Sequence, residues 1–201
     1  NVLHKNDYGT ASDAAGSLSV DMLGSPFGWT LDPQCEPAIT ATSAAVVNEK
    51  RILVVQHAGE QNWWQNKRSM PSHIITHPAL SDTDLSQIST DDWDGLVLIS
   101  DEAQPKGYAD FKNKTVLWRP KSLVLGIGCD RNTPLHVLKA GIDVFLAEFN
   151  LAKASVSALA SIALKADEKG IWEDFNVKLI GVDIDAINIT EDREQFRELM
   201  L

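Results

Sequence analysis

The fold is indicated by the stretch Lys121-Ser-Leu-Val-Leu-Gly-Ile-Gly-Cys-Asp-Arg-Asn-Thr-Pro134, which has the pattern of a strand that runs through a glycine turn into a helix. Its apolar run, Leu123 to Leu125, is short and continuous, as is typical of a strand covered on both faces. Gly126 and Gly128 carry no Cβ, so the backbone can turn sharply there or approach a ligand closely. The stretch therefore predicts an α/β fold with a loop at the carboxyl end of a strand.

The end of this stretch has the signal of a helix start. The Thr133 hydroxyl can cap a free N–H, and Pro134 occupies a position whose N–H would have no partner. Apolar residues then recur at helical spacing: Leu135, Leu138, Ile142, Phe145, Leu146 and Phe149. We expect a helix from Pro134 to about Phe149. Ligands of open α/β sheets bind at such strand ends, and a helix N-terminus there favours carboxylate or phosphate.

Two interpretations of the glycine loop stay open at this point. Strand–glycine–helix turns occur throughout α/β proteins, and two glycines without the third of a dinucleotide fingerprint are weak evidence for a nucleotide. Spacing alone therefore favours a purely structural turn. Cys129 favours a ligand site, because a thiol in an amide-rich loop has little packing reason to be there.

Composition excludes several classes of protein. The chain has 201 residues, of which 44% are hydrophobic and 23% charged, and this composition is typical of a folded soluble protein. The formal net charge of −10 argues against nucleic acid and against an anionic membrane surface as partners. An anionic ligand would therefore need a local basic pocket.

Cysteine usage and hydropathy indicate the compartment. Cys35 and Cys129 are far apart and lack the spacing of a zinc site, so reduced thiols fit better than a disulfide framework. The sequence contains no apolar run of membrane-helix length and no secretory pattern at its amino terminus. We expect a cytoplasmic protein that does not contact a membrane.

Strand and helix patterns alternate along the chain, with few hairpin signals between them. Apolar runs predict strands over 51–56, 72–77, 94–100, 115–118, 158–164 and 177–182, and helices over 38–48 and 191–201. We predict two small three-layer α/β/α domains with mostly parallel or mixed sheets. Residues 31–118 would form a central α/β region and residues 119–201 a carboxyl-terminal domain, with a boundary at Arg119-Pro120. Residues 1–30 would be the remnant of a preceding domain.

A second group of charged residues follows a predicted strand. Lys165 could pair with a substrate carboxylate, while Asp167 or Glu168 acts as a general base. The alternative, which the sequence alone favours, is a solvated turn that caps the next helix.

The histidines give two further candidates. His73 and His77 are four residues apart, but a strand context keeps such side chains distant, so a metal site is disfavoured. His57 and Glu60 precede Trp63 and Trp64, and either a pocket with an aromatic wall or surface packing would explain them. We predict no metal site.

Two spaced motifs resemble a known family. The GIGC stretch at 123–134 and the KADE stretch at 158–170 are similar to the carboxyl-terminal domain of the cobalamin-biosynthesis protein CbiG, cobalt-precorrin-5A hydrolase, and to its stand-alone relative CobE. Three upstream segments, 20–29, 43–48 and 56–64, are similar to the family's central region. Residues 10–13 resemble the motif that closes its amino-terminal domain. The resemblance covers residues 8 to about 185.

This resemblance implies a role in anaerobic cobalamin biosynthesis. The family reaction opens the ring A δ-lactone of cobalt-precorrin-5A with water and releases acetaldehyde, giving cobalt-precorrin-5B. The implied partners are a cobalt-corrinoid intermediate and other enzymes of the pathway. Cobalt would be carried by the substrate, so no cofactor is expected. The family's glycine-rich amino-terminal domain has no counterpart here, and we expect a central and carboxyl-terminal piece of a longer or fused enzyme.

The family chemistry also implies roles for the two motifs. The amides of Gly126, Ile127 and Gly128, up to Cys129, would hold carboxylates or the lactone oxyanion, together with Arg131 and Thr133. Asp167 or Glu168 would be the base, Lys165 would bind substrate, and Cys129 is a further catalytic candidate. A non-catalytic, CobE-like corrinoid carrier is the alternative function. A phosphate or nucleotide binder is a third, which depends on the glycine loop alone.

Overall fold

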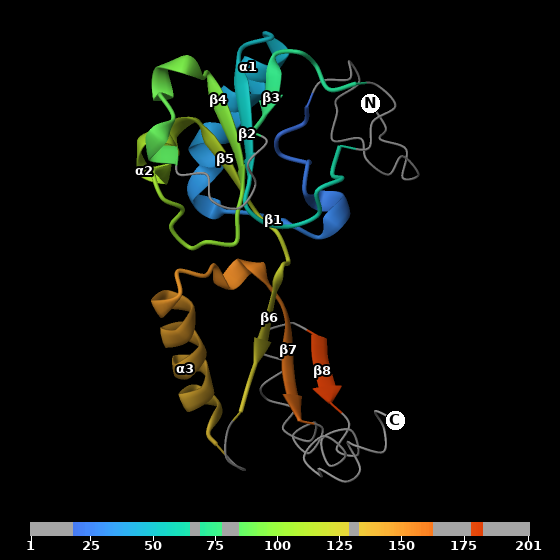
Figure 1. Cartoon of the computed structure of the whole chain (residues 1–201), viewed down its shortest axis with the longest axis vertical. Helices are drawn as coiled ribbons and strands as arrows, with labels where there is room; N and C mark the ends of the chain where they lie inside the picture. The colour runs from blue at the N-terminus through green and yellow to red at the C-terminus, as the bar shows by residue number, and fades with distance from the viewer. Residues whose placement is uncertain (1–17, 65–68, 78–84, 129–132, 163–177, 183–201) are drawn as a thin grey trace, which may run out of the picture. The chain divides into compact units, whose positions relative to one another are not determined.

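A computed structural model describes residues 18–64, 69–77, 85–128, 133–162 and 178–182 (Figure 1). The chain forms two compact units. The first comprises residues 1–122 and 150–155, and the second comprises residues 123–149 and 156–201. The segment 150–155 follows the helix of the second unit in sequence but belongs to the first unit.

The first unit contains a five-stranded sheet. Its strands are β1 (Thr30–Leu31), β2 (Ile52–Gln56), β3 (Ile74–Thr76), β4 (Gly95–Ile99) and β5 (Thr115–Arg119), in the order β1-β5-β4-β2-β3. Strands β2 to β5 are parallel to their neighbours, and β1 pairs antiparallel with β5. The mostly parallel sheet predicted from the sequence is therefore confirmed.

Burial explains why these strands could be predicted. Every residue of β2, β4 and β5 is buried, as continuous apolar runs indicate for strands covered on both faces. Helix α1 (Glu36–Val47) packs against β5, β4 and β2 (Figure 1). A Cβ at Gly95 would lie 2.9 Å from Thr42 Cγ2, so the missing side chain lets α1 approach the sheet closely.

Short elements complete the first unit. They are α2 (Tyr108–Phe111) and the 3-10 turns η1 (Ser25–Phe27), η2 (Pro33–Cys35), η3 (Leu85–Gln87), η4 (Thr90–Asp92), η5 (Lys112–Lys114) and η6 (Lys153–Ser155). Residues 18–29 contribute to the core of this unit, since Leu18, Val20 and Leu23 are buried. The Trp118 Nε1–H donates a hydrogen bond to the Val20 carbonyl at 2.9 Å, which anchors this segment at the end of β5.

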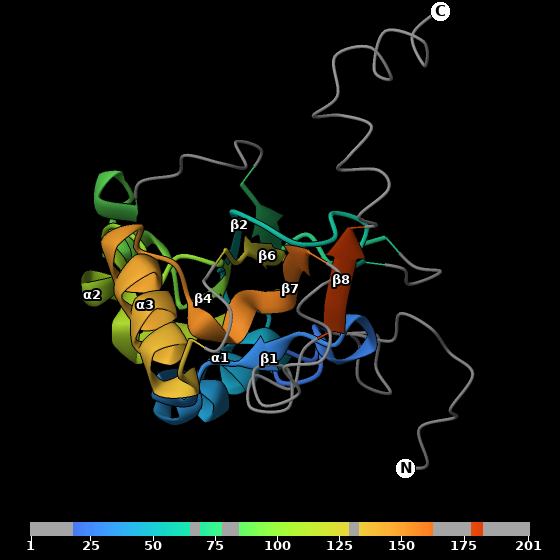
Figure 2. The same cartoon turned by 90° about the horizontal axis from the view of Figure 1, so that it is seen from below.

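The second unit contains a three-stranded parallel sheet. Strands β6 (Leu123–Gly126), β7 (Val156–Ile162) and β8 (Lys178–Val182) lie side by side in that order (Figure 2). Helix α3 (Leu135–Glu148) connects β6 to β7 and buries Leu138, Ile142 and Leu146. The two sheets with their helices confirm the α/β fold. The helix expected over 191–201 lies outside the described residues.

Two details of the predicted strand–turn–helix were wrong. Helix α3 begins at Leu135, and its N-cap is Pro134, whose extended backbone (ψ 138°) leaves Thr133 outside the helix. The N-cap position is therefore Pro134 and not the predicted Thr133. Strand β6 is also not covered on both faces, because Leu125 is 7% exposed whereas Val124 is 53% exposed. Strand β6 lies at the edge of its sheet, and successive side chains point to opposite faces.

None of the described helices has the length and apolar character needed to cross a bilayer.

Candidate functional site

Strands β6 and β7, which precede the glycine loop and the Lys165–Glu168 motif in sequence, end at the same edge of the second sheet. Strands β6 and β7 are parallel neighbours, with Gly126 paired to Ala160. The Ile127 N–H extends this ladder by donating to the Ala160 carbonyl at 2.8 Å. The loops that follow both strands therefore begin side by side at the carboxyl edge, where open α/β sheets bind ligands.

The two loop glycines do not serve a left-handed turn. Gly28, Gly59 and Gly107 have a positive φ, whereas Gly126 and Gly128 do not. Among the described residues, a Cβ at Gly126 or Gly128 would meet no atom within 4 Å, and both glycines are exposed. A left-handed backbone therefore does not explain these two glycines, and the close approach of a ligand stays a prediction.

The structure describes part of the predicted site. Gly126, Ile127, Gly128 and Thr133 lie at the carboxyl edge of β6 and before α3. The remaining predicted residues, which are Cys129, Arg131, Lys165, Asp167 and Glu168, fall outside the described residues.

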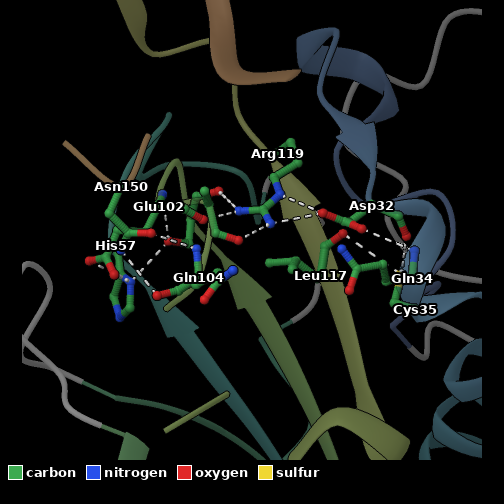
Figure 3. A network of polar contacts seen from close by, with 11 residues as sticks. Asp32, Gln34, Cys35, His57, Glu102, Gln104, Leu117, Arg119 and Asn150 are labelled. Carbon is green, nitrogen blue, oxygen red and sulfur yellow. Dashed lines mark hydrogen bonds and ion pairs between the residues drawn. The ribbon is translucent and has the colours of Figure 1, made fainter. Parts of the chain in front are cut away.

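A second polar group occupies the carboxyl edge of the first sheet (Figure 3). The chain passes from β2 to β3 on one side of β2, and then to β4 on its other side. This makes the β2/β4 boundary a topological switch point, the usual ligand position in a doubly wound sheet. His57 follows β2, while Ser100 and Glu102 follow β4. We call these three residues the switch-point cluster.

Distances within the switch-point cluster are short. His57 Nδ1 lies 3.1 Å from Ser100 Oγ and 3.7 Å from the Glu102 carboxylate. The Glu102 N–H donates to Ser100 Oγ at 3.1 Å. The His57 side chain is 5% exposed, and its Nε2 is buried without a hydrogen-bond partner in the described part of the chain. Glu102 is 35% exposed and gives the cluster access to solvent.

Arg119 holds the loop that carries Glu102. Its guanidinium pairs with the Asp32 carboxylate, at 2.8 Å from both Nε and Nη2 (Figure 3). The same group donates to the carbonyls of residues 100, 102 and 103. Because Arg119 is 3% exposed, this charge depends on Asp32 and the carbonyl oxygens for its stabilisation.

Asn150 holds the same loop from the other side. Its side-chain oxygen accepts from the Gln104 N–H at 2.9 Å, and its side-chain nitrogen donates to the Gln104 carbonyl at 3.1 Å. The Asn150 carbonyl accepts from the Ala103 N–H at 2.7 Å. The backbone of residues 100–104 is thus hydrogen-bonded by Arg119 on one side and by Asn150 on the other. These bonds position the Glu102 side chain beside His57.

The expected pocket of His57, Glu60 and two tryptophans has a different arrangement. Trp63 is 4% exposed and donates from Nε1 to the Gln56 side chain at 3.0 Å, so it packs in the core. Glu60 is exposed and accepts from the Asn62 N–H at 2.8 Å. Packing is therefore the better explanation for Trp63, and a local turn contact is the better explanation for Glu60. The signal for the true partners was the polar sequence Ser100-Asp101-Glu102 directly after a predicted strand.

Cys35 lies next to Asp32 in this network, and its surroundings disfavour a reactive thiol. It is fully buried, and its Sγ–H donates to the Asp32 carbonyl at 2.9 Å. Burial raises the pKa of the Cys35 thiol, and the nearby Asp32 carboxylate adds to this increase.

We expect Cys35 to resist thiol reagents in the folded protein. In a Cys129→Ser variant, Cys35 is the one remaining thiol of the chain. Its reaction with a disulfide reagent at pH 8 should be at least ~100-fold slower than in urea, because the thiolate is disfavoured and labelling requires local opening. Stopped-flow absorbance measures both rates. Rapid labelling without denaturant would contradict the burial described here.

Comparison with known proteins identifies the family. The chain matches the family model described as cobalamin biosynthesis central region over residues 18–120, and that of the cobalamin synthesis G C-terminus over residues 123–198. The chain belongs to the CbiG family. The resemblance predicted from the two spaced motifs is thus confirmed.

Individual relatives agree with this assignment. The chain is 35% identical over 164 residues to a protein of Priestia megaterium named cobalt-precorrin-5A hydrolase, covering 82% of this chain and 42% of that protein. The chain therefore spans less than half the length of this relative. A 40-residue stretch is 48% identical to the arginine-specific carbamoyl phosphate synthase large chain of Halalkalibacterium halodurans, covering 20% of this chain and 4% of that protein.

A solved structure also matches. It is the crystal structure of a cobalamin biosynthesis protein G homologue from Sulfolobus solfataricus, with a TM-score of 0.33 and 18% sequence identity. The match covers 86% of this chain and 45% of that one.

Proposed function

We propose that this chain acts in anaerobic cobalamin biosynthesis, in the hydrolytic opening of the ring A δ-lactone of cobalt-precorrin-5A. The reaction releases acetaldehyde and gives cobalt-precorrin-5B. The observation that supports this proposal is the similarity to a cobalt-precorrin-5A hydrolase, which extends over 82% of the chain and so includes residues of both units. Cobalt enters as part of the substrate.

The chemistry assigns tasks to the edge of the second sheet. Lactone hydrolysis needs a base that activates water and donors for the developing oxyanion. We assign the donors to the amides from Gly126 to Cys129, aided by Arg131 and Thr133. Asp167 or Glu168 would be the base, and Lys165 would pair with a substrate carboxylate. The parallel pairing of β6 and β7 supports this assignment, because both loops start at one edge.

Alanine at the two loop glycines should weaken substrate binding without weakening the fold. We expect Gly126→Ala and Gly128→Ala to raise the Kd for the corrinoid about tenfold, because a methyl group would stand where the ligand approaches the backbone. The space around both positions is open, so the thermal midpoint should not fall. Calorimetric titration and thermal unfolding measure the two effects.

Gly141→Ala is the matched control for these variants. Gly141 is also exposed, and a Cβ there would also meet no atom within 4 Å, but it lies in α3. This variant should bind the corrinoid like the parent. Equal affinity in all four proteins would contradict the assignment of the glycine loop.

The decisive experiment mixes the purified chain with cobalt-precorrin-5A under anaerobic conditions. The corrinoid absorption spectrum and acetaldehyde are followed together. Acetaldehyde release supports the hydrolase, and Asp167→Asn, Glu168→Gln and Cys129→Ser would then separate the base from the other candidates. A spectral change without acetaldehyde supports the alternative, a corrinoid carrier. This alternative is considered because the chain matches only 42% of the length of the hydrolase. No change in either signal would contradict both.

A further inference from the structure

We propose that the switch-point cluster of the first unit is a second ligand site, where His57 Nε2–H donates a hydrogen bond to a carbonyl or carboxylate oxygen of the corrinoid. The identity of the ligand rests on the proposed function. The site itself rests on the position of the cluster and on its hydrogen bonds.

The hydroxyl of Ser100 determines which nitrogen of His57 carries the proton. Ser100 is fully buried, and its Oγ accepts the hydrogen bond from the Glu102 N–H. The hydroxyl proton still needs an acceptor, and His57 Nδ1 at 3.1 Å is the acceptor that the described residues provide. Nδ1 therefore accepts, and the neutral imidazole carries its hydrogen on Nε2.

The buried Nε2–H has no hydrogen-bond partner among the residues that the structure describes. Buried polar groups are nearly always hydrogen-bonded, so this donor needs an explanation. Protonation of the ring does not remove the problem, because the imidazolium also has a hydrogen on Nε2 while its Nδ1–H faces the Glu102 carboxylate. In both states the missing group is a hydrogen-bond acceptor. A metal ion fits less well, because the described residues contain no group of three His, Cys, Asp or Glu side chains that could hold one.

The neighbouring residue Gln56 shows that buried polar side chains at this position find hydrogen-bond partners within the protein. Gln56, one residue earlier, donates from its side-chain nitrogen to the carbonyls of Ala58 and Glu60, and its side-chain oxygen accepts from Trp63. His57 lies at the carboxyl end of β2 beside β4, where ligands of such sheets bind. An unpaired donor at that position points to a ligand atom.

The loop does not need His57 for its own structure. Arg119 and Asn150 already bind the backbone of residues 100–104 from both sides. The contribution of His57 to this arrangement is its contact with the Ser100 and Glu102 side chains. The buried imidazole is therefore better explained by binding than by support of the loop.

Substitution of His57 tests the proposal. The probe is dicyanocobyrinic acid, a corrinoid with free carboxylates, titrated into the full chain. We expect His57→Phe to raise its Kd about tenfold, and His57→Gln, which keeps an N–H donor, to stay within about threefold of the parent. The heptamethyl ester of the probe separates the two oxygen types. If His57→Phe weakens binding of the ester as much as binding of the free acid, Nε2–H donates to a carbonyl; if it weakens binding of the free acid alone, Nε2–H donates to a carboxylate.

His73→Phe provides a matched control. His73 Nε2 is also buried without a partner in the described part of the chain. His73 precedes β3 and therefore lies at the amino-terminal ends of the parallel strands, opposite to His57. The His73 carbonyl accepts a hydrogen bond there from the Ile52 N–H. The same substitution there should leave corrinoid affinity unchanged. An equal loss of affinity in both variants would contradict a site at the switch point.

Stability separates binding from a purely structural role. The double variant His57→Phe/Ser100→Ala removes the unpaired donor, the hydroxyl that fixes its tautomer and the acceptor of the Glu102 N–H. A binding role predicts that this variant has the affinity of the single variant, whether or not its thermal midpoint falls. A lowered midpoint with parental affinity would overturn the proposal. Nitrogen NMR of the imidazole gives a further test, because protonation of Nδ1 in the free neutral ring would also overturn it.

Turnover distinguishes this proposal from the proposed function. Acetaldehyde release with parental Kd and KM in His57→Phe would contradict the second site and leave the hydrolase standing. Corrinoid binding that depends on His57, without acetaldehyde release, would support the second site and reject hydrolysis by this chain. If the parent binds neither probe, the second site is rejected.

Discussion

Replacing Arg119 by methionine should lower the free energy of unfolding by about 3–5 kcal/mol, because it leaves the buried Asp32 carboxylate without its partner. Asp32 and Arg119 are 9% and 3% exposed, so solvent screens their interaction little. The variant also removes the donors to three carbonyls of residues 100–103. Equilibrium unfolding in urea, followed by tryptophan fluorescence, measures the loss.

Two further variants make this prediction specific. Arg51→Met removes an exposed arginine that stacks on Trp93 at 4.8 Å, and it should cost less than about 1 kcal/mol. Arg119→Met/Asp32→Leu removes both buried charges and should recover part of the stability lost in the single variant. A loss below about 1 kcal/mol for Arg119→Met would indicate that Asp32 is solvated in the folded protein.

The position of Arg119 shows why the sequence did not reveal this network. Arg119-Pro120 follows a predicted strand, and the sequence predicts a domain boundary there. In the structure Arg119 is the buried last residue of β5, and its partner Asp32 is 87 residues away. Antiparallel pairing of β1 with β5 brings them together. Strand β1 has two residues, and such a short pair has no apolar pattern to predict it.

Continuous apolar runs explain which parts of the fold were predictable. The runs at 51–56, 94–100 and 115–118 predict β2, β4 and β5, because these strands bury every residue. Strand order depends on long-range packing, which local patterns do not contain. The contact of His57 with Ser100, 43 residues later, follows from that order. The different burial of Val124 and Leu125 likewise depends on which face of the second sheet is covered, because their side chains point to opposite faces.

Gly107→Ala should be the second strongly destabilising substitution. Gly107 has a φ of 78°, and a Cβ there would lie 2.2 Å from the Ser86 nitrogen and 2.6 Å from the Leu85 carbonyl carbon. Both are backbone atoms, so no side-chain rotation relieves the clash. The left-handed backbone costs an alanine about 1–2 kcal/mol and the overpacking about 1–3 kcal/mol more. Urea unfolding should therefore show a loss of about 2–5 kcal/mol.

Gly28→Ala separates the two contributions to this loss. Gly28 has a similar φ of 68°, but a Cβ there would meet no atom within 4 Å. Its alanine variant should thus lose the backbone part alone, about 1–2 kcal/mol. The difference between the two variants measures the close contact of Gly107 with residues 85–86, where the Leu85 N–H donates to the Lys106 carbonyl at 3.2 Å. Equal losses in both variants would mean that this segment moves away from Gly107 at little cost, although Leu85 is fully buried in the core.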